Sequence, residues 1–260
     1  MKQRIITAIA ALAVLGVLLF LMPPLAVHIA LGALIVGGAW EWSGFLGHAG
    51  SAMRFIFVAV IAALLTITVM FLSAWTEQIF MLSLAWWFVA LIWTFLFPTP
   101  IPQAIRWLVG VLVLVPLYLA LMILYTADPL ILLFALLVVW VADSGAYFAG
   151  KTMGRVKLAP QISPGKTWEG VIGGLVAVAL LVGLRSIWVQ TDLFVLIPFC
   201  LAAAALSIVG DLTVSMFKRT AGVKDSGTMF PGHGGVLDRI DSVAAAAPLF
   251  ALGLSWVGLK

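Results

Sequence analysis

Charge is scarce in this chain. Lysine, arginine, aspartate and glutamate make up 9% of its 260 residues, whereas water-soluble domains carry roughly 25%. Hydrophobic residues account for 64%, and no stretch is polar enough to fold as a separate soluble domain. We therefore expect one integral membrane domain over residues 1–260. Within it, residues 1–128 form a helical amino-terminal half, and residues 129–260 carry the chemistry.

Cysteine is almost absent. Cys200 is the only one and lies inside an apolar run, which excludes an intramolecular disulfide and a metal centre with four cysteine ligands. The chain also lacks a basic tail, so no nucleic-acid partner is expected. No internal repeat is evident, and this disfavours a transporter built from inverted repeats.

Apolar runs long enough to cross a bilayer are abundant. A helix needs roughly 20 apolar residues to span a hydrocarbon core of about 30 Å, and open strands would leave backbone groups unpaired in lipid. The sequence therefore predicts an all-α polytopic membrane protein with about nine transmembrane helices. The predicted segments are 5–22, 25–46, 53–73, 79–97, 105–125, 129–149, 170–189, 193–216 and 239–257.

The charges between these segments alternate from one side to the other. Twelve of the 14 lysines and arginines fall on one side, which the positive-inside rule assigns to the cytoplasm. We expect the amino terminus inside, the carboxyl terminus outside, and a location in the cytoplasmic (inner) membrane. A cleaved signal peptide is the alternative for the first segment, because Lys2 and Arg4 precede it. Its long apolar run and the pair Pro23–Pro24 disfavour cleavage.

Tryptophan is frequent in the fourth and fifth segments, at Trp86, Trp87, Trp93 and Trp107. A stacking platform for a nucleotide base is one interpretation. Tryptophan is typical of membrane interfaces, so interfacial anchoring is the expectation.

Residues 211–241 hold four of the ten acidic and four of the fourteen basic residues. In the predicted topology Asp143, Asp211, Asp238 and Asp241 all fall near the cytoplasmic ends of their helices. Carboxylates gathered in a membrane repel one another unless they are paired or bind a cation. Oxygen donors without clustered cysteine or histidine favour a hard ion such as Mg²⁺ over zinc. The sequence predicts a metal site beside the inner leaflet.

A structural role for the same residues is the alternative. Asp238 could cap the ninth helix, while Arg239 and Asp241 pair with neighbouring charges. Asp211 lies inside its helix and cannot be a cap there, which favours the metal site.

The loop between the last two segments has the composition of a phosphate site. Lys218, Arg219, Lys224 and Arg239 can meet several phosphate charges, and the run 231–235 offers backbone amides between glycines. A basic loop that attracts anionic headgroups is the alternative.

A second polar stretch, 143–151 and 163–170, lies on the same predicted side. From it Lys151, Lys166 and Glu169 could reach the same bound nucleotide.

These motifs together resemble the CDP-diacylglycerol synthase (phosphatidate cytidylyltransferase) family. The resemblance rests on Ser215, Lys218-Arg219, Lys224-Asp225, Pro231-Gly232-His233-Gly234-Gly235, Asp238-Arg239 and Asp241, and on the runs 143–147 and 163–170. It implies Mg²⁺-dependent transfer of CMP from CTP to phosphatidic acid, with CDP-diacylglycerol and pyrophosphate as products, in phospholipid biosynthesis. It also implies a homodimer among membrane lipids, and it allows a second, monovalent cation such as K⁺.

The matching positions imply Asp211, Asp238 and Asp241 as metal ligands. We expect a catalytic set of Asp143, Lys218, Arg219, Lys224, Asp225, His233 and Arg239. We expect a nucleotide-binding set of Lys151, Lys166, Glu169, Ser215, Gly232, Gly234 and Gly235. Two alternatives stay open: a cation-coupled transporter with buried aspartates, and a related transferase that uses a different lipid phosphate as acceptor.

Overall fold

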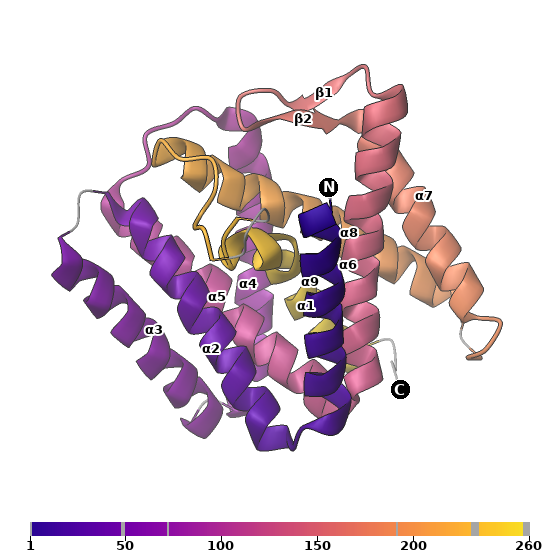
Figure 1. Ribbon diagram of the computed structural model, residues 1–260, viewed down its shortest axis with the longest axis horizontal. Helices are drawn as coiled ribbons and strands as arrows, with labels where there is room; N and C mark the ends of the chain where they lie inside the picture. Colours follow the sequence, from indigo (N-terminus) through magenta and orange to yellow (C-terminus); the bar gives the residue numbers. More distant parts are fainter. Residues whose placement is uncertain (1, 48–49, 72, 191, 230–233, 257–260) are drawn as a thin grey trace.

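The computed structural model describes residues 2–47, 50–71, 73–190, 192–229 and 234–256. Within these ranges the chain forms nine α-helices and one two-stranded hairpin (Figure 1). The elements are α1 (Lys2–Leu21), α2 (Pro24–Ser43), α3 (Ser51–Phe71), α4 (Thr76–Leu96), α5 (Gln103–Ala127), α6 (Pro129–Met153), β1 (Lys157–Ala159), β2 (Ser163–Thr167), α7 (Trp168–Arg185), α8 (Leu193–Thr220) and α9 (Leu237–Trp256). Short 3₁₀ turns follow α2 and precede α4, at Gly44–Leu46 and Ser73–Trp75.

Each predicted segment corresponds to one of these helices. Seven of them, α2 to α8, are long and apolar enough to cross a membrane. The described part of α1 has a shorter apolar stretch, Ile9–Leu21, and α9 carries charged residues in its first turns. The predicted fold class, an all-α polytopic membrane protein, is confirmed. How many of the nine helices cross the membrane, and on which sides the termini lie, stay predictions.

Side-chain caps and prolines set several helix starts. The Asp128 carboxylate accepts a hydrogen bond from the Leu130 amide at 2.7 Å at the start of α6. Asp192 accepts one from the Phe194 amide at 2.9 Å at the start of α8. Such caps satisfy backbone amides that have no partner within the helix. Two acidic residues on the predicted outer side thus have a structural role.

The core of the bundle runs along α5 and α9. α5 is the most completely buried of the seven candidate spans, and it packs against α9, α2, α3 and α6. Large apolar side chains on other helices remain exposed, for example Phe55 on α3, Phe88 on α4 and Leu180 on α7. In a helical membrane protein such apolar surface is expected to face lipid.

The expectation of interfacial anchoring needs a correction at Trp87. Trp87 is fully buried rather than placed at an outer surface. Trp86 lies against it, with ring centroids 6.3 Å apart. Trp93 contacts Phe217 of α8 at 6.1 Å. The Trp93 ring thus packs α4 onto α8, a role that suits a large aromatic side chain in an interior.

The segment after α6 differs from the predicted polar loop. Residues 157–159 and 163–167 form an antiparallel hairpin, with Lys157 opposite Thr167 and Ala159 opposite Ser163. Figure 1 shows this hairpin at the end of α6, running directly into α7. Thr167 then caps α7 by accepting a hydrogen bond from the Gly170 amide at 3.1 Å. The hairpin therefore fixes the side chains of β2 relative to both helices.

Candidate active site

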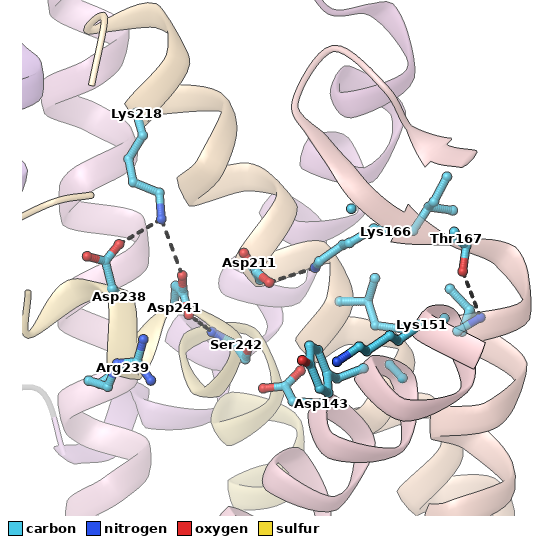
Figure 2. Close-up of a pocket in the computed structure, with 18 of the residues that line it drawn as sticks. Asp143, Lys151, Lys166, Thr167, Asp211, Lys218, Asp238, Arg239, Asp241 and Ser242 are labelled. Carbon is cyan, nitrogen blue, oxygen red and sulfur yellow. Dashed lines mark hydrogen bonds and ion pairs between the residues drawn. The ribbon is translucent and has the colours of Figure 1, made fainter. Parts of the chain in front are cut away.

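A cavity of about 650 Å³ lies between α6, α7, α8, α9 and β2. Its wall combines carboxylates and ammonium groups with apolar side chains such as Tyr147, Val171 and Ile208. Figure 2 shows the charged side chains converging on it from separate elements. A site of this composition suits a ligand that has both anionic and apolar parts.

One group of charges joins the end of α8 to the start of α9. Lys218 Nζ donates to Asp238 Oδ1 at 2.7 Å and lies 3.9 Å from Asp241 Oδ2. All three side chains are at most 9% exposed. Asp238 and Asp241 share one helix face because they are three residues apart. The two helices approach closely here, since a Cβ at Gly210 would collide with the carbonyl oxygen of Asp241.

A second ion pair joins β2 to α8. Lys166 Nζ lies 2.7 Å from Asp211 Oδ2, and the two side chains are 24% and 28% exposed. Ser215, one turn further along α8, donates its hydroxyl proton to Asp211 Oδ1 at 3.1 Å. The hairpin therefore brings a lysine against a carboxylate 45 residues later in the chain.

The loop that joins α8 to α9 is held by two carboxylates. Asp238 Oδ2 accepts the backbone amides of Ser226 and Gly235, each at 2.9 Å. From the opposite side Glu41 of α2 accepts the amides of Val236 and Leu237 at 2.9 and 2.8 Å. Glu41 also accepts the Ser226 hydroxyl at 2.7 Å. The start of α9 is thus fixed by a residue from the other half of the chain.

The structure brings nine of the predicted site residues to the cavity wall. They are Asp143, Lys151, Lys166, Asp211, Lys218, Asp225, Asp238, Arg239 and Asp241. Their gathering from α6, β2, α8, the following loop and α9 agrees with the predicted common depth of the four aspartates.

Six other predicted residues are described but are not among the lining residues. They are Glu169, Ser215, Arg219, Lys224, Gly234 and Gly235. Arg219 instead holds the hairpin, because its Nε donates to the Ile162 carbonyl at 3.1 Å. Its Nη1 donates to the Val223 carbonyl, after the end of α8, at 3.1 Å. Glu169 accepts the Val156 amide at 3.2 Å. Gly232 and His233 lie outside the described residues.

Part of the structural alternative is present. Asp238 accepts the Gly235 amide just before α9, and Asp241 lies within ion-pair distance of Lys218. In the described part of the chain, no three histidine, cysteine, aspartate or glutamate side chains lie close enough together to hold a metal ion as they stand. The metal site therefore stays a prediction. In this structure Lys166 contacts Asp211, and Lys218 contacts Asp238.

Sequence reasoning missed three residues of the site. Thr167 and Ser242 line the cavity, and Glu41 holds the loop behind it. Ser242 directly follows Asp241, and Thr167 directly follows Lys166, so proximity to singled-out residues could have found both. Glu41 could have been singled out as an acidic residue inside a predicted span, but its partners could not, because they lie 185 to 196 residues away.

The chain is similar to known proteins over nearly its whole length. The model of the cytidylyltransferase family matches residues 2–257. A protein of Haemophilus influenzae named phosphatidate cytidylyltransferase is 37% identical, across 96% of this chain and 97% of that protein. One of the same name from Pseudomonas aeruginosa is 41% identical, across 98% of this chain and 97% of that protein.

A third relative matches a shorter region more closely. The phosphatidate cytidylyltransferase of Staphylococcus saprophyticus is 47% identical over 120 residues, which is 45% of this chain and 46% of that protein. The family match covers every element that lines the cavity. This chain belongs to the cytidylyltransferase family.

Proposed function

We propose that this protein is a phosphatidate cytidylyltransferase, which transfers CMP from CTP to phosphatidic acid to form CDP-diacylglycerol and pyrophosphate. The observation that carries the proposal is the cavity itself, where cationic side chains and carboxylates from three helices, the hairpin and the loop after α8 surround one space. Relatives that share nearly the whole chain bear the name of this activity.

The reaction needs positioning more than a strong base. A phosphate oxygen of the lipid attacks the α-phosphorus of CTP, and the bond from that phosphorus to the oxygen bridging to the β-phosphate breaks as pyrophosphate leaves. A phosphate monoester has a second pKa near about 6 and is already largely ionised at pH 7. The barrier arises from bringing two anions together and from charge that shifts onto the leaving group.

The cationic side chains on the wall answer that requirement. Lys166 and Lys218 are each already held at a fixed position by a carboxylate. Lys151 and Arg239 face the same cavity. We assign these four groups to the phosphates of CTP and of the lipid. Fixed charges stabilise a developing charge without reorganising during the reaction.

Mg²⁺ belongs to the proposal as a cofactor. The oxygen ligands on the wall are the carboxylates of Asp211 and Asp241 and the hydroxyl of Ser242, and Ser215 supports Asp211 through a hydrogen bond; these hard oxygen ligands fit Mg²⁺. Asp211 and Asp241 would hold the ion, with Asp238 as the third ligand that the family resemblance implies. When bound, Mg²⁺ supplies neutralisation of phosphate charge. Lys166 and Lys218 already contact oxygens of these carboxylates, so the ion would bind beside the two ammonium groups.

The location of the site follows the charge distribution of the sequence. We infer that the cavity opens at the cytoplasmic side of the inner membrane, where CTP arrives from water and the lipid from the bilayer. The apolar side chains of Tyr147, Val171 and Ile208 on the wall suit the diacyl part of the lipid. A homodimer is part of the same proposal.

The test is a reaction with purified protein in detergent. We expect pyrophosphate release from labelled CTP to require both Mg²⁺ and phosphatidic acid, and the labelled product to be CDP-diacylglycerol. A panel of other lipid phosphates decides the acceptor, since a product formed only with another lipid would replace phosphatidic acid in the proposal. Cation flux across sealed vesicles in the absence of nucleotide would instead favour the transporter. A transporter should also have its charged residues spread through the depth of the membrane.

A matched pair of aspartates tests the site assignment. Asp211→Asn is expected to lower turnover by on the order of a hundredfold or more, because it removes a charge from the cavity wall. Asp192→Asn should leave turnover near that of the unmodified protein, because asparagine also caps helices and Asp192 is the cap of α8. Near-normal turnover of folded Asp211→Asn would show that the wall carboxylates are assigned wrongly.

A further inference from the structure

Glu41 is an acidic side chain in an apolar helix, and none of the motifs singled out in the sequence contains it. It lies near the end of α2, within a candidate membrane span. Its carboxylate meets three donors: the amides of Val236 and Leu237 and the hydroxyl of Ser226. All three distances are 2.7 to 2.9 Å. A carboxylate is costly in a membrane helix unless it is satisfied in this way.

The loop is shaped to receive this carboxylate. A Cβ at Gly227 or at Gly235 would collide with the carboxylate of Glu41. The Leu237 amide is the first of α9, so Glu41 caps that helix from another part of the chain. A negative charge at a helix amino terminus also interacts favourably with the helix dipole.

A continuous series of contacts leads from Glu41 to the cavity. Ser226 donates its hydroxyl proton to Glu41 and its amide proton to Asp238. Asp238 in turn accepts from Lys218, whose Nζ lies 3.9 Å from Asp241 Oδ2. Glu41 is not among the described residues that line the cavity. Any effect on the reaction must therefore pass through the loop and the start of α9.

We propose that Glu41 is a positioning residue for the transfer reaction: it fixes the start of α9 and the loop before it, and so sets where Asp238, Asp241 and Lys218 point. This inference rests on the proposed function. A carboxylate with two acceptor oxygens suits three donors, whereas the amide of glutamine would turn an N–H group toward one of them. Outer groups that orient functional side chains typically affect activity by about 10- to 100-fold.

The test begins with Glu41→Gln, with Glu77→Gln as the control. Glu77 is an exposed glutamate in the first turn of α4. We expect Glu41→Gln to lower kcat by about 10- to 100-fold with little change in KM, because the groups that bind substrate remain but are misaligned. Glu77→Gln should behave like the unmodified protein. Equal kcat for the two variants would overturn the proposal.

Coupling to Ser226 separates positioning from a general loss of stability. Ser226→Ala removes only the hydroxyl that joins Glu41 to the loop. If both residues act through one network, the double variant Glu41→Gln/Ser226→Ala will be no slower than Glu41→Gln alone. Losses that multiply would mean independent effects and would contradict the proposal. Glu41→Asp keeps the charge on a shorter side chain, and its kcat should lie between that of the unmodified protein and that of Glu41→Gln.

Hydrogen exchange gives a readout that does not depend on activity. In Glu41→Gln, peptides covering Val236 and Leu237 should exchange faster than in Glu77→Gln, because one of the two carboxylate oxygens that accept their amides is replaced by an NH₂ group. Unchanged exchange there would refute the role of Glu41. If the unmodified protein fails to convert CTP and phosphatidic acid, the proposed function fails, and the exchange experiment still decides on Glu41. If Glu41→Gln does not fold, Ser226→Ala is compared with Glu77→Gln in its place. Unchanged kcat and unchanged hydrogen exchange in Ser226→Ala would then contradict the proposal.

Discussion

Lys218 balances two buried carboxylates at the cavity wall. Its side chain is 8% exposed, and Asp238 and Asp241 are 7% and 9% exposed. Breaking a buried ion pair by removing one partner typically costs about 3–5 kcal/mol, because a charge is left without compensation. Lys218 therefore contributes to stability as well as to the proposed chemistry.

We predict that Lys218→Met unfolds at a markedly lower temperature than the unmodified protein in detergent, with a loss of about 3–5 kcal/mol. Asp241→Asn added to this variant should restore part of the loss, because it removes the uncompensated charge. Lys224→Met is the control, since Lys224 is exposed. A Lys218→Met protein with an unchanged unfolding temperature would contradict this account.

Lys166 offers a second prediction at the same scale. Its ammonium group reaches Asp211 from the hairpin and faces the cavity. Lys166→Met should lower kcat/KM for CTP by on the order of a hundredfold, because a positioned cation for the phosphates is lost. Lys166→Arg should retain part of the activity, and Lys157→Met, an exposed change on β1, should retain nearly all. Measured pyrophosphate release that is the same for Lys166→Met and Lys157→Met would exclude this role.

Individual residues were predictable to different degrees. That Asp211, Asp238 and Asp241 face one cavity could be predicted, because charge in an apolar chain is conspicuous and the spacing of Asp238 and Asp241 fixes their helix face. The contact of Arg219 with the hairpin could not, since nothing local indicates that Ile162 lies beside α8. The partners of Glu41 could not be predicted for the same reason, because they are remote in sequence.

Among the elements, α6 and α7 form the most extensive helix pair. Small residues line this contact. A Cβ at Gly174 would lie 2.6 Å from the Ala142 carbonyl oxygen, and one at Gly145 would lie 2.8 Å from Ala177 Cβ. Small residues let helix backbones approach closely in membranes, where no hydrophobic effect drives helices together. The glycines of this pair thus serve packing, and they place Asp143 and the hairpin at the cavity.

One substitution at two positions of α7 tests that role. Gly174→Ala should destabilise the protein by about 1–3 kcal/mol, because the added methyl meets backbone that cannot move aside. Gly183→Ala has open space within 4 Å and should stabilise the helix by up to about 1 kcal/mol. Thermal unfolding in detergent measures both. Equal effects at the two positions would show that close packing is not what glycine provides at Gly174.

The helices themselves were predictable, and the hairpin was not. Helix positions follow from the length of apolar runs, which the bilayer imposes, so each predicted segment overlaps one helix. Strands β1 and β2 are only three and five residues long, and β2 contains Pro164 and Gly165, which disfavour strands in general. Their pairing depends on the ends of α6 and α7 being held together, which is a tertiary effect.

At the scale of the whole molecule, the two halves of the chain meet at the site. The cavity wall comes from α6 to α9 and β2, yet α9 packs against α4 and α5, and its first turn is capped by Glu41 of α2. All the described residues of the cavity wall lie in residues 129–260, and residues 1–128 support them through these contacts.

The topology of the whole molecule yields a last prediction. If twelve of the 14 cations mark the cytoplasmic side, the hairpin lies inside and the start of α4 lies outside. Replacing the fully buried Cys200 by alanine gives a background for single cysteines at two exposed positions, Lys157→Cys and Glu77→Cys. In right-side-out vesicles an impermeant maleimide should label only Glu77→Cys, and in inside-out vesicles only Lys157→Cys. The reverse pattern would mean that the orientation is inverted. Labelling of both cysteines from one side would mean that the segments between them do not alternate in direction as predicted. Either result would remove the argument that CTP reaches the cavity from the cytoplasm.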